Sequence, residues 1–381
     1  MRSSKSVLVI GAGIGGLAAA TALASRGVAV TVVEKRPGNE VLGVGINQPA
    51  NSLRVLRDLG VLDEIIANGY LFDRTSFFDH KGRTIADIPS SLGGDVPANC
   101  ALRRSALANV LYSAALSAGA VIHHGVEVAG LDDDGASVAV VGQGAEFGRF
   151  DLAIAFDGTH SRIREQLFGG EIQPLYTGYF VWRVTLPRDP SVTNVQVFHG
   201  PDLYAGVIPL SEEDMYMFVV TREQSPTRYA TADFHKIITD YLAEFTGPIG
   251  RARAALPTDA DIVCSPQYEL LLEPAWHKGR IIVAGDAAHL SAPTLTQGAA
   301  MALEDAALLV EMLDGDLPLQ ALFEQFTVRR TPRVKLVQQV SGAILRWGDL
   351  VDKLGYERAL EQLSHAGDRV RAVEKVLNQP Y

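Results

Sequence analysis

The sequence predicts an α/β fold in which a parallel sheet is interleaved along the chain with a mostly antiparallel sheet, followed by C-terminal helices. Three observations lead to this prediction. Short apolar strands followed by glycine turns and helices occur at the N-terminus and again near residues 152 and 280, as in parallel sheets covered on both faces. From about residue 176 to 266, strands follow one another without helices between them, which favours an antiparallel sheet. Beyond about residue 331, apolar residues recur at helical spacing.

The size and composition of the chain limit the classes of protein to which it can belong. Its 381 residues are enough for about two domains, and 47% hydrophobic with 20% charged residues is usual for a globular protein. The formal net charge of -10 is not offset by a basic block, which argues against a nucleic-acid partner. No uninterrupted apolar run reaches the roughly 18 residues of a membrane span.

The cysteines exclude two kinds of chemistry. Cys100 and Cys264 lie far apart, and neither belongs to a CxxC pair or to a cluster with zinc-ligand spacing. We therefore expect no disulfide exchange and no metal site, and a reducing cytoplasm is the simplest compartment.

The N-terminal segment has the pattern of a dinucleotide-binding unit. An apolar strand expected over residues 7–10 leads into three glycines, a run of helix formers, a second apolar strand over 28–33 and then an acid. In such units the glycines permit a tight turn, the approach of a pyrophosphate and close packing of helix on strand, and the acid binds a ribose hydroxyl. The candidate cofactor-binding residues here are Gly11, Gly13, Ile14, Gly15, Gly16, Glu34 and Lys35.

Two simpler interpretations of this segment compete with nucleotide binding. One is a secretory signal, because Lys5 precedes an apolar stretch and Ala22-Leu23-Ala24 resembles a cleavage site. The other is a strand-helix-strand unit that binds no nucleotide. Because glycines interrupt the apolar run and the second strand continues the pattern, nucleotide binding is favoured.

The segments after Lys35 contain two further candidate contacts to a cofactor, one at Gly45 and one at Arg103 or Arg104. Residues 43–48, with Gly45, are expected to form a loop that either covers the cofactor or merely joins a strand to a helix. Residues 72–99 consist of short alternating pieces with turns and are expected to leave the first sheet. Arg103 and Arg104 stand at the start of the next helix, where an arginine is either solvated or paired with a phosphate.

Asp157 and Gly158 follow a buried-type strand expected over residues 152–156. The carboxyl ends of parallel strands are where open α/β sheets bind ligands. The alternative is that Asp157 caps the next helix, and both roles can coexist. Before this point, strands are expected over 121–128 and 137–141.

The antiparallel part is expected to contain strands over residues 180–185, 195–198, 205–209 and 215–220, with a helix near 234–245 covering one side. Its most notable side chains are Trp182, Arg183, Tyr204 and Tyr216. Each of them either packs in the core or contacts a substrate.

A third glycine-containing segment follows a strand expected over residues 280–284. The helix that starts at Gly298 has no acid in its first turn, so its N–H groups and dipole would face an anion. The candidate cofactor-binding residues of this segment are Asp286, Pro293, Gln297, Gly298, Ala299 and Ala300.

In these three segments the chain resembles the single-component FAD-dependent aromatic hydroxylases, the class A flavoprotein monooxygenases that include 4-hydroxybenzoate, salicylate, urate and hydroxypyridine-carboxylate hydroxylases. The similarity covers nearly the whole chain. It is carried by Gly11, Gly13, Gly16 and Glu34, by Asp157, Gly158, Ser161 and Arg164, and by Gly285, Asp286, His289, Pro293, Gln297 and Gly298. Arg104 matches the family's arginine near the flavin ribityl and phosphate groups better than Arg103 does.

The resemblance implies a Rossmann-like FAD-binding domain interleaved with a substrate domain. Asp286 would bind the ribityl chain, the helix after Gly298 would face the pyrimidine edge of the flavin, and Asp157-Gly158 is associated with both FAD and NAD(P)H. The implied division assigns 1–71, 100–175 and 268–330 to FAD binding, 72–99 and 176–267 to the substrate domain, and 331–381 to a C-terminal helical layer.

The implied activity is hydroxylation of a small aromatic or N-heteroaromatic substrate with O2. NADH or NADPH would reduce FAD, and a C4a-hydroperoxyflavin would transfer the oxygen. The single GxGxxG motif fits transient docking of NADH or NADPH. Epoxidation or heteroatom oxygenation by the same cofactor is one alternative, and a non-catalytic flavin-binding regulator is an alternative of another class. A monomer and a homodimer both fit.

The substrate-binding candidates are Arg183, Tyr204, Tyr216 and Pro293. Tyr204 stands where urate-type members carry an arginine, Tyr216 matches a tyrosine of that subgroup, and Arg183 is the best partner for a substrate carboxylate. The catalytic base is unknown. Tyr204, Tyr216, His199 and His289 are candidates to relay the proton of a phenolic substrate, and His289 alternatively positions its loop.

Overall fold

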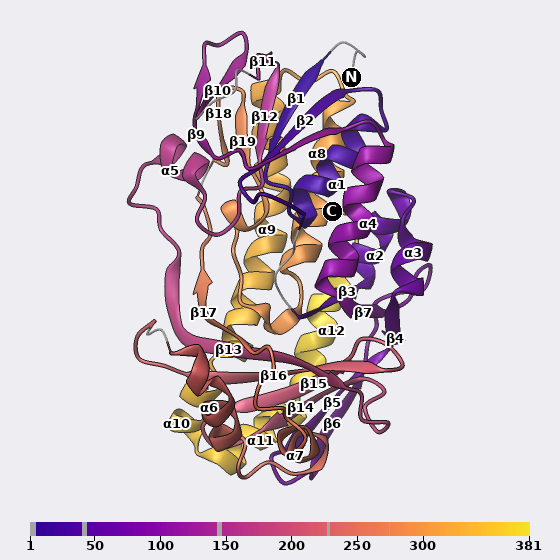
Figure 1. Ribbon diagram of the computed structural model, residues 1–381, viewed down its shortest axis with the longest axis vertical. Helices are drawn as coiled ribbons and strands as arrows, with labels where there is room; N and C mark the ends of the chain where they lie inside the picture. The colour runs from indigo at the N-terminus through magenta and orange to yellow at the C-terminus, as the bar shows by residue number, and fades with distance from the viewer. Residues whose placement is uncertain (1–4, 40–43, 143–146, 227–228, 274) are drawn as a thin grey trace.

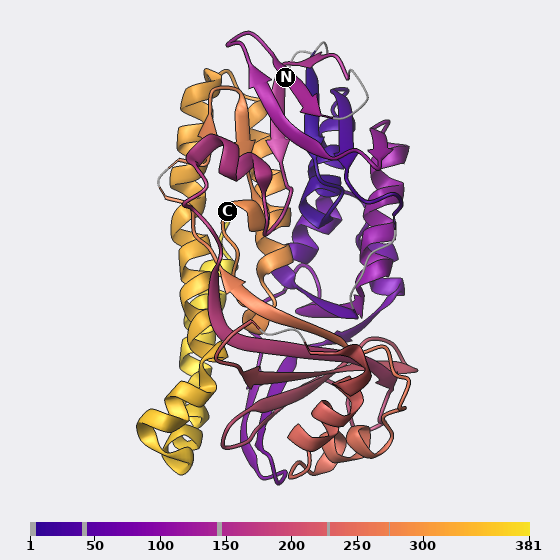
Figure 2. The same cartoon turned by 60° about the vertical axis from the view of Figure 1, so that its left-hand side comes forward.

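Two large sheets lie at opposite ends of an elongated molecule (Figure 1). The computed structural model describes residues 5–39, 44–142, 147–226, 229–273 and 275–381. The helices beside or between the sheets include α1 (Ile14–Ala24), α4 (Arg104–Ser117), α8 (Gly298–Leu313) and α9 (Leu319–Leu345). Figure 2 shows α9, drawn in orange to yellow, running along one side of the molecule toward the level of the second sheet.

The six-stranded sheet has the order β18-β19-β12-β1-β2-β8. Its strands are β1 (Ser6–Ile10), β2 (Ala29–Glu34), β8 (Val121–His124), β12 (Leu152–Ala155), β18 (His277–Lys278) and β19 (Ile281–Val283). Neighbours pair in parallel except β18 and β19. The apolar residues of β1 and β12 are buried on both faces, as parallel sheets require, and the predicted parallel sheet is confirmed.

The three glycine-containing segments leave this sheet at one edge. Val7 of β1 lies opposite Leu152 of β12, and Ala153 lies opposite Ile281 of β19. Because the three strands are adjacent and parallel, their carboxyl ends deliver Gly11, Asp157 and Gly285 to the same side of the sheet.

The seven-stranded sheet has the order β17-β13-β16-β15-β14-β5-β6. Its strands are β5 (Arg74–Asp79), β6 (Thr84–Pro89), β13 (Leu175–Pro187), β14 (Val195–His199), β15 (Tyr204–Pro209), β16 (Asp214–Arg222) and β17 (Val263–Glu269). All neighbours are antiparallel except β14 and β5. One face packs on α6 (Phe234–Tyr241) and α7 (Gly247–Ala254) through side chains such as Trp182, Phe198 and Met217. The other face lines a cavity.

The loop expected over residues 43–48 is wrong for its described part. Gly45–Pro49 is the strand β3, in a three-stranded sheet with β7 (Asn99–Arg103) and β4 (Gly69–Phe72). Its backbone pairs antiparallel with β7, and Gly45 lies opposite Arg103. This partner is far away in the chain, so local sequence does not reveal the pairing. Gly43 lies outside the described residues.

The single strand expected over residues 121–128 is also wrong. β8 ends at His124, Gly125 has a φ of +72°, and β9 (Val128–Asp133) belongs to a different sheet together with β10 (Val138–Gly142) and β11 (Arg149–Phe150). The left-handed backbone of Gly125 breaks the strand and redirects the chain.

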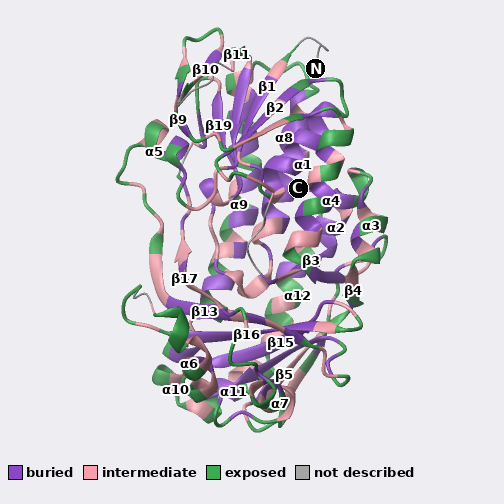
Figure 3. Ribbon diagram, in the orientation of Figure 1, coloured by how far each residue is buried: buried purple, intermediate pink, exposed green. Residues whose placement is uncertain are grey.

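The C-terminal helices continue beyond α9 as α10 (Trp347–Leu354), α11 (Tyr356–Ser364) and α12 (Ala366–Leu377). The boundary proposed at residues 330 and 331 falls inside α9, so the helical layer is continuous with the preceding segment. In Figure 1, α12 lies between the levels of the two sheets. Figure 3 shows many buried residues in the strands of both large sheets.

The remaining described elements are short. They are α2 (Ala50–Asp58), α3 (Leu62–Ala67), α5 (Arg162–Phe168), η1 (Thr231–Asp233), η2 (Gly285–Ala287) and η3 (Pro293–Leu295). No described helix combines the length and apolarity needed to cross a bilayer.

Candidate active site

The first part of the site, which we call the cradle, is formed by residues at the ends of parallel strands and at the start of α8. It comprises Gly11–Gly16, Glu34, Asp157–Gly158, Gly285–Asp286 and Gln297–Ala300. Gly11 has a φ of +101°, and a Cβ on Gly16 would overlap the carbonyl oxygen of Gly11. A Cβ on Gly13 would meet nothing within 4 Å. Gly13 begins α1, which has neither a side-chain cap nor an acid in its first turn. The free N–H groups therefore suit a phosphate.

Glu34 lies at the carboxyl end of β2, where hydrogen bonds hold its carboxylate in place. Its Oε2 accepts a hydrogen bond from the Ala12 N–H at 2.8 Å, and its Oε1 accepts from the backbone N–H and Nε of Arg36, each at 3.0 Å. Burial raises the pKa of Glu34, but the Arg36 and Ala12 hydrogen bonds outweigh it and lower the pKa below its usual value. Lys35 is exposed. Arg36, not Lys35, contacts the acid, because the bend that follows β2 turns the Arg36 backbone N–H and side chain back toward Glu34.

The two carboxylate oxygens of Asp157 differ in their hydrogen bonding. Its Oδ2 accepts from the Ile163 N–H at 3.2 Å, whereas its buried Oδ1 has no hydrogen-bond partner among the described residues. Ser161 caps α5 by accepting from the Arg164 N–H at 2.9 Å. Burial raises the pKa of Asp157. One oxygen thus serves the helix start, and the other is an acceptor for a ligand hydroxyl.

Arg164 connects two parts of the cradle. It is almost fully buried and donates to the carbonyl oxygens of Ala287 and Thr159, each at 3.1 Å. It therefore fixes the loop after β12 against the loop after β19.

Asp286 and the start of α8 form the opposite part of the cradle. A Cβ on Gly298 would lie 3.9 Å from Oδ1 of Asp286. α8 has no side-chain cap and no acid in its first turn, as predicted. Burial raises the pKa of Asp286, and the charges of His289 and Arg104 oppose the rise. Arg104 is exposed and forms no ion pair with any described residue, so its guanidinium is available to an anion.

These groups fit FAD. Two bare helix N-termini, of α1 and α8, supply N–H donors for anionic or carbonyl oxygens, and the unpaired Asp157 oxygen suits a ligand hydroxyl. The open backbone at Gly13 leaves room where a pyrophosphate would approach. Among the described residues, no group of histidines, cysteines and acids is arranged to hold a metal.

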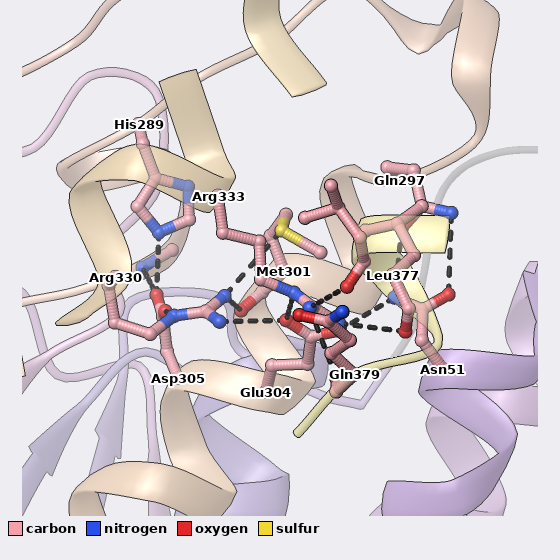
Figure 4. Close-up of polar contacts among 12 residues, drawn as sticks. Asn51, His289, Gln297, Met301, Glu304, Asp305, Arg330, Arg333, Leu377 and Gln379 are labelled. Atoms are coloured by element: carbon pink, nitrogen blue, oxygen red, sulfur yellow. Dashed lines mark hydrogen bonds and ion pairs between the residues drawn. The ribbon is translucent and has the colours of Figure 1, made fainter. Parts of the chain in front are cut away.

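A buried ionic cluster connects the cradle to the C-terminal helices (Figure 4). Arg330 of α9 donates to Asp305 Oδ1 and to Glu304 Oε2, each at 2.7 Å. Asp305 Oδ2 accepts from the Gly285 N–H at 2.9 Å and lies 2.6 Å from His289 Nε2. Burial raises the pKa of Asp305, but the charges of His289 and Arg330 lower it to about 2. Asp305 and Arg330 therefore hold the Gly285 turn in place.

His289 belongs to this cluster and not to the lining of the cavity. Its ring packs 5.0 Å from the ring of Trp276. This geometry favours the interpretation that His289 positions its loop. Neither Asp305 nor Arg330 was among the sequence candidates, because an acid in a helix and an arginine one helix later carry no local signal of their pairing.

The cavity lies between the open face of the seven-stranded sheet and the segment from Pro293 to Gln297, and has a volume of about 250 Å³. One water needs about 10–15 Å³ on a comparable measure. The sequence candidates Arg183, Tyr204, Tyr216, Pro293 and Gln297 all line it. The structure thus brings the substrate candidates together beside the cradle.

Arg183 is the only arginine or lysine that lines the cavity among the described residues. Its Nη1 donates to Ser265 Oγ at 3.2 Å, and no described carboxylate forms an ion pair with it. Desolvation lowers the pKa of the guanidinium, and the nearby charge of Arg104 adds to the effect. A cation in this position lacks the partner that normally offsets its burial.

Tyr216 interacts electrostatically with Arg183 and packs against the strand β3. A Cβ on Gly45 would overlap the Tyr216 ring, so β3 approaches the substrate sheet closely here. Gly45, proposed from sequence as a cofactor residue, thus also shapes the cavity. Burial raises the pKa of Tyr216 to about 12, so the phenol is protonated at neutral pH and is a hydrogen-bond donor.

Three further polar atoms in the lining have no partner among the described residues: Tyr204 Oη, His199 Nδ1 and Asn47 Oδ1. The rings of His199 and Tyr204 stack at 5.3 Å. Desolvation raises the pKa of Tyr204 and lowers that of His199 to about 3, so both are neutral. Asn47 was not found from sequence, since it lies in the segment interpreted as a loop.

We compared the sequence and the fold with those of known proteins. The sequence model of the family described as FAD binding domain matches residues 4–341. The YetM protein of Bacillus subtilis (strain 168), provisionally named as an FAD-dependent monooxygenase, is 31% identical over 351 residues, covering 90% of this chain and 93% of that protein. The 2-heptyl-3-hydroxy-4(1H)-quinolone synthase of Pseudomonas aeruginosa is 29% identical over 364 residues, covering 90% and 89%.

Among solved structures, HpxO of Klebsiella pneumoniae, complexed with FAD and uric acid, has the same fold. Its TM-score is 0.86 at 22% sequence identity, and the match covers 99% of this chain and 97% of that one.

Proposed function

The chain belongs to the family of FAD-dependent aromatic hydroxylases, and from this premise we propose that it hydroxylates an aromatic or N-heteroaromatic ring that carries an acidic group near the hydroxylation site. NADH or NADPH is the proposed electron donor. The quinolone in the name of the Pseudomonas relative and the uric acid in the Klebsiella complex are N-heteroaromatic, which supports this class of ring.

The observation that carries the proposal is Arg183, which lines a cavity beside the cradle and forms no ion pair with a carboxylate of the described residues. A partly buried cation without a carboxylate is costly, and an anionic substrate group offsets that cost. A carboxylate or phenolate on the ring would accept charge-assisted hydrogen bonds from the guanidinium. Tyr216, protonated at neutral pH, adds a neutral donor beside it.

Bound FAD, reduced by NADH or NADPH, supplies the electrons and the site at which O2 is activated. The residues of the chain hold the ring and limit water. Arg183 and Tyr216 orient the acidic end, while the neutral pair His199 and Tyr204 presents unfilled hydrogen-bonding atoms without adding charge. The apolar walls restrict water around the reacting ring.

The test is a panel of hydroxylated and carboxylated aromatic and N-heteroaromatic rings, scored for both NAD(P)H consumption and hydroxylated product. Arg183→Met is expected to lower kcat/KM for acidic rings by about 10- to 100-fold, the range expected for a lost hydrogen bond to a charged group. Arg183→Lys keeps the charge and is expected to lose less.

The matched control is Arg74→Met, an exposed arginine of the same sheet that pairs with Asp87, and it is expected to behave as wild type. If Arg183→Met affects acidic and neutral rings equally, the proposed anion contact is excluded. If no ring gives a hydroxylated product, the proposed activity is excluded.

A further inference from the structure

The cavity continues far beyond the acidic end. Arg183, Phe218, Gly206, Val197 and Phe77 are successive partners in register across the strands β13, β16, β15, β14 and β5. Neighbouring strands lie about 4.8 Å apart, so the backbones at the two ends of this row are about 19 Å apart. Every member of the row except Gly206 lines the cavity. A single ring held at Arg183 is too short to reach Phe77.

A second row shows the same change from polar to apolar. Tyr216 lies opposite Ile208, Val195 opposite Thr75, and Thr75 opposite Ile88. Gln196 of β14 pairs with Val207 of β15, so Val195 and Ile208 are the next residues along these two strands. The cavity is lined by Tyr216, Ile208, Val195, Thr75 and Ile88. In both rows the charged or phenolic residue is at the β13–β16 side. We call the part of the cavity over Val195, Val197, Thr75, Phe77 and Ile88 the apolar arm.

The helix α12 forms the wall opposite these strands. Its lining residues Ala366, Val370, Val373 and Leu377 follow one another at spacings of four and three, which places them on one face of a helix. Leu363 of α11 and Leu92 extend the same wall. The arm is thus bounded by aliphatic and aromatic side chains on both sides.

The arm has no free charge among the described residues. His199, whose ring lies 6.0 Å from that of Phe77, is neutral because burial lowers its pKa to about 3. The carboxylate of Glu374 is already used: Oε1 accepts from Ser90 Oγ at 2.7 Å, and Oε2 accepts from the Ser91 N–H at 2.8 Å and Ser91 Oγ at 2.6 Å. The carboxylate therefore anchors α12 to the loop after β6 and is not aimed at a ligand.

The C-terminal end of α12 is fixed to the cradle side of the molecule. Arg333 of α9 donates to the carbonyl oxygens of Val376 at 2.7 Å and Leu377 at 2.9 Å. The same guanidinium forms a paired contact with Glu304 of α8, with both bonds at 2.8 Å (Figure 4). These contacts hold the C-terminal end of the α12 wall in a fixed position over the strands.

We propose, resting on the proposed function, that the substrate ring carries an extended, unbranched apolar chain, which lies in the apolar arm between β14, β5, β6 and α12. The acidic or oxygenated end of the ring lies at Arg183 and Tyr216, and α12 limits the chain length. A compact, fully polar ring would leave the apolar arm in contact with water only, whereas a chain removes that surface from water.

The test uses two homologous series, 4-alkylsalicylates and 2-alkyl-4-hydroxyquinolines, with chains from methyl to nonyl, kept below their micelle-forming concentrations. Kd is measured by calorimetry and by the change in flavin absorbance of the FAD-loaded protein. We expect Kd to fall by about fourfold for each added methylene, because burying one contributes about 0.8 kcal/mol, and to level off when the chain reaches α12. A Kd that does not depend on chain length would overturn the proposal.

Variants locate the chain. Val370→Trp fills the arm and is expected to make Kd level off at a shorter chain. Val373→Ala removes bulk from the same wall and is expected to make Kd level off at a longer chain. This second variant keeps the test usable if Val370→Trp does not fold. The matched control is Ala372→Trp on the exposed face of α12, which is expected to keep the wild-type limit. An unchanged limit in both cavity variants would also overturn the proposal.

The two proposals fail separately. If unsubstituted rings are hydroxylated and chain length changes neither Kd nor kcat/KM, the apolar chain is excluded and the proposed function stands. If chains raise affinity as expected but no ring yields a hydroxylated product, the proposed function is excluded and the apolar binding arm stands.

Discussion

The cradle and the cavity are built in different ways. The cradle uses backbone N–H groups, glycines and single acids at the ends of three adjacent parallel strands, and each part comes from a short continuous segment. The cavity is lined by side chains from nine strands and from the helices α9, α11 and α12, so its chemistry is assembled from residues far apart in the chain. The proposed cofactor site is therefore encoded by local sequence, whereas the proposed substrate site depends on strand register and on the position of α12.

The largest expected effect comes from the buried cluster that supports the cradle. Arg330→Met leaves the buried Asp305 without its cation, and we expect the free energy of unfolding to fall by about 3–5 kcal/mol. Urea unfolding of the purified protein measures it. The control is Arg329→Met, the exposed neighbour on the same helix, which is expected to change stability little. A loss below about 1 kcal/mol for Arg330→Met would show that the cluster does not support the fold.

The second prediction separates the two roles of cradle glycines. Gly16→Ala places a Cβ on the Gly11 carbonyl, and we expect a loss of about 1–3 kcal/mol of stability together with loss of bound FAD. Gly13→Ala meets no atom, so it is expected to cost less than about 1 kcal/mol as a helix N-cap change while still weakening FAD binding. Unfolding midpoints and FAD content are measured for both. Equal stability of the two variants would contradict the assignment.

The third prediction concerns the pH dependence of the cavity. His199 has a pKa of about 3 in the fold because of desolvation, against about 6.5 in an unfolded chain. The unfolded state therefore takes up a proton below about pH 6.5, and stability falls as the pH is lowered. Between pH 7.5 and pH 5 this one group is expected to remove about 2 kcal/mol.

The variant His199→Gln tests this dependence. It is expected to flatten the fall in unfolding free energy between pH 7.5 and pH 5 relative to wild type. His80 and His277, whose pKa values are also lowered by burial, keep their contributions in both proteins. If wild type and variant show the same slope, His199 is not neutral in the folded cavity.

The smallest effect is expected where β3 packs against the wall of the cavity. Gly45→Ala pushes against the Tyr216 ring, and we expect KM for the substrate to rise by about tenfold, corresponding to about 1.4 kcal/mol, while FAD content stays unchanged. Gly315→Ala is the control, since its Cβ would make only an ordinary contact at 3.4 Å. A fall in FAD content would assign Gly45 to the cradle instead.

The sequence predicted most of the cradle and part of the cavity. Gly11, Glu34, Asp157 and Asp286 were found because each stands in a motif whose geometry is local: an apolar strand, a turn and the start of a helix. Arg183, Tyr204 and Tyr216 were identified as candidates, and the structure places them in one cavity. The loop predicted over residues 43–48 was wrong for residues 45–48, because their strand character comes from pairing with β7 and not from their own sequence.

What the sequence alone determined was therefore the alternation of parallel-type and antiparallel-type strands and the motifs at the strand ends, since both follow from residue spacing and glycine chemistry over a few residues. Only the tertiary structure decided that Arg330 supports Asp305, that His289 belongs to the cluster they form, and that α12 closes an apolar arm over Phe77 and Ile88. These contacts join residues far apart in the chain, and burial and strand register, which local patterns do not contain, bring them together.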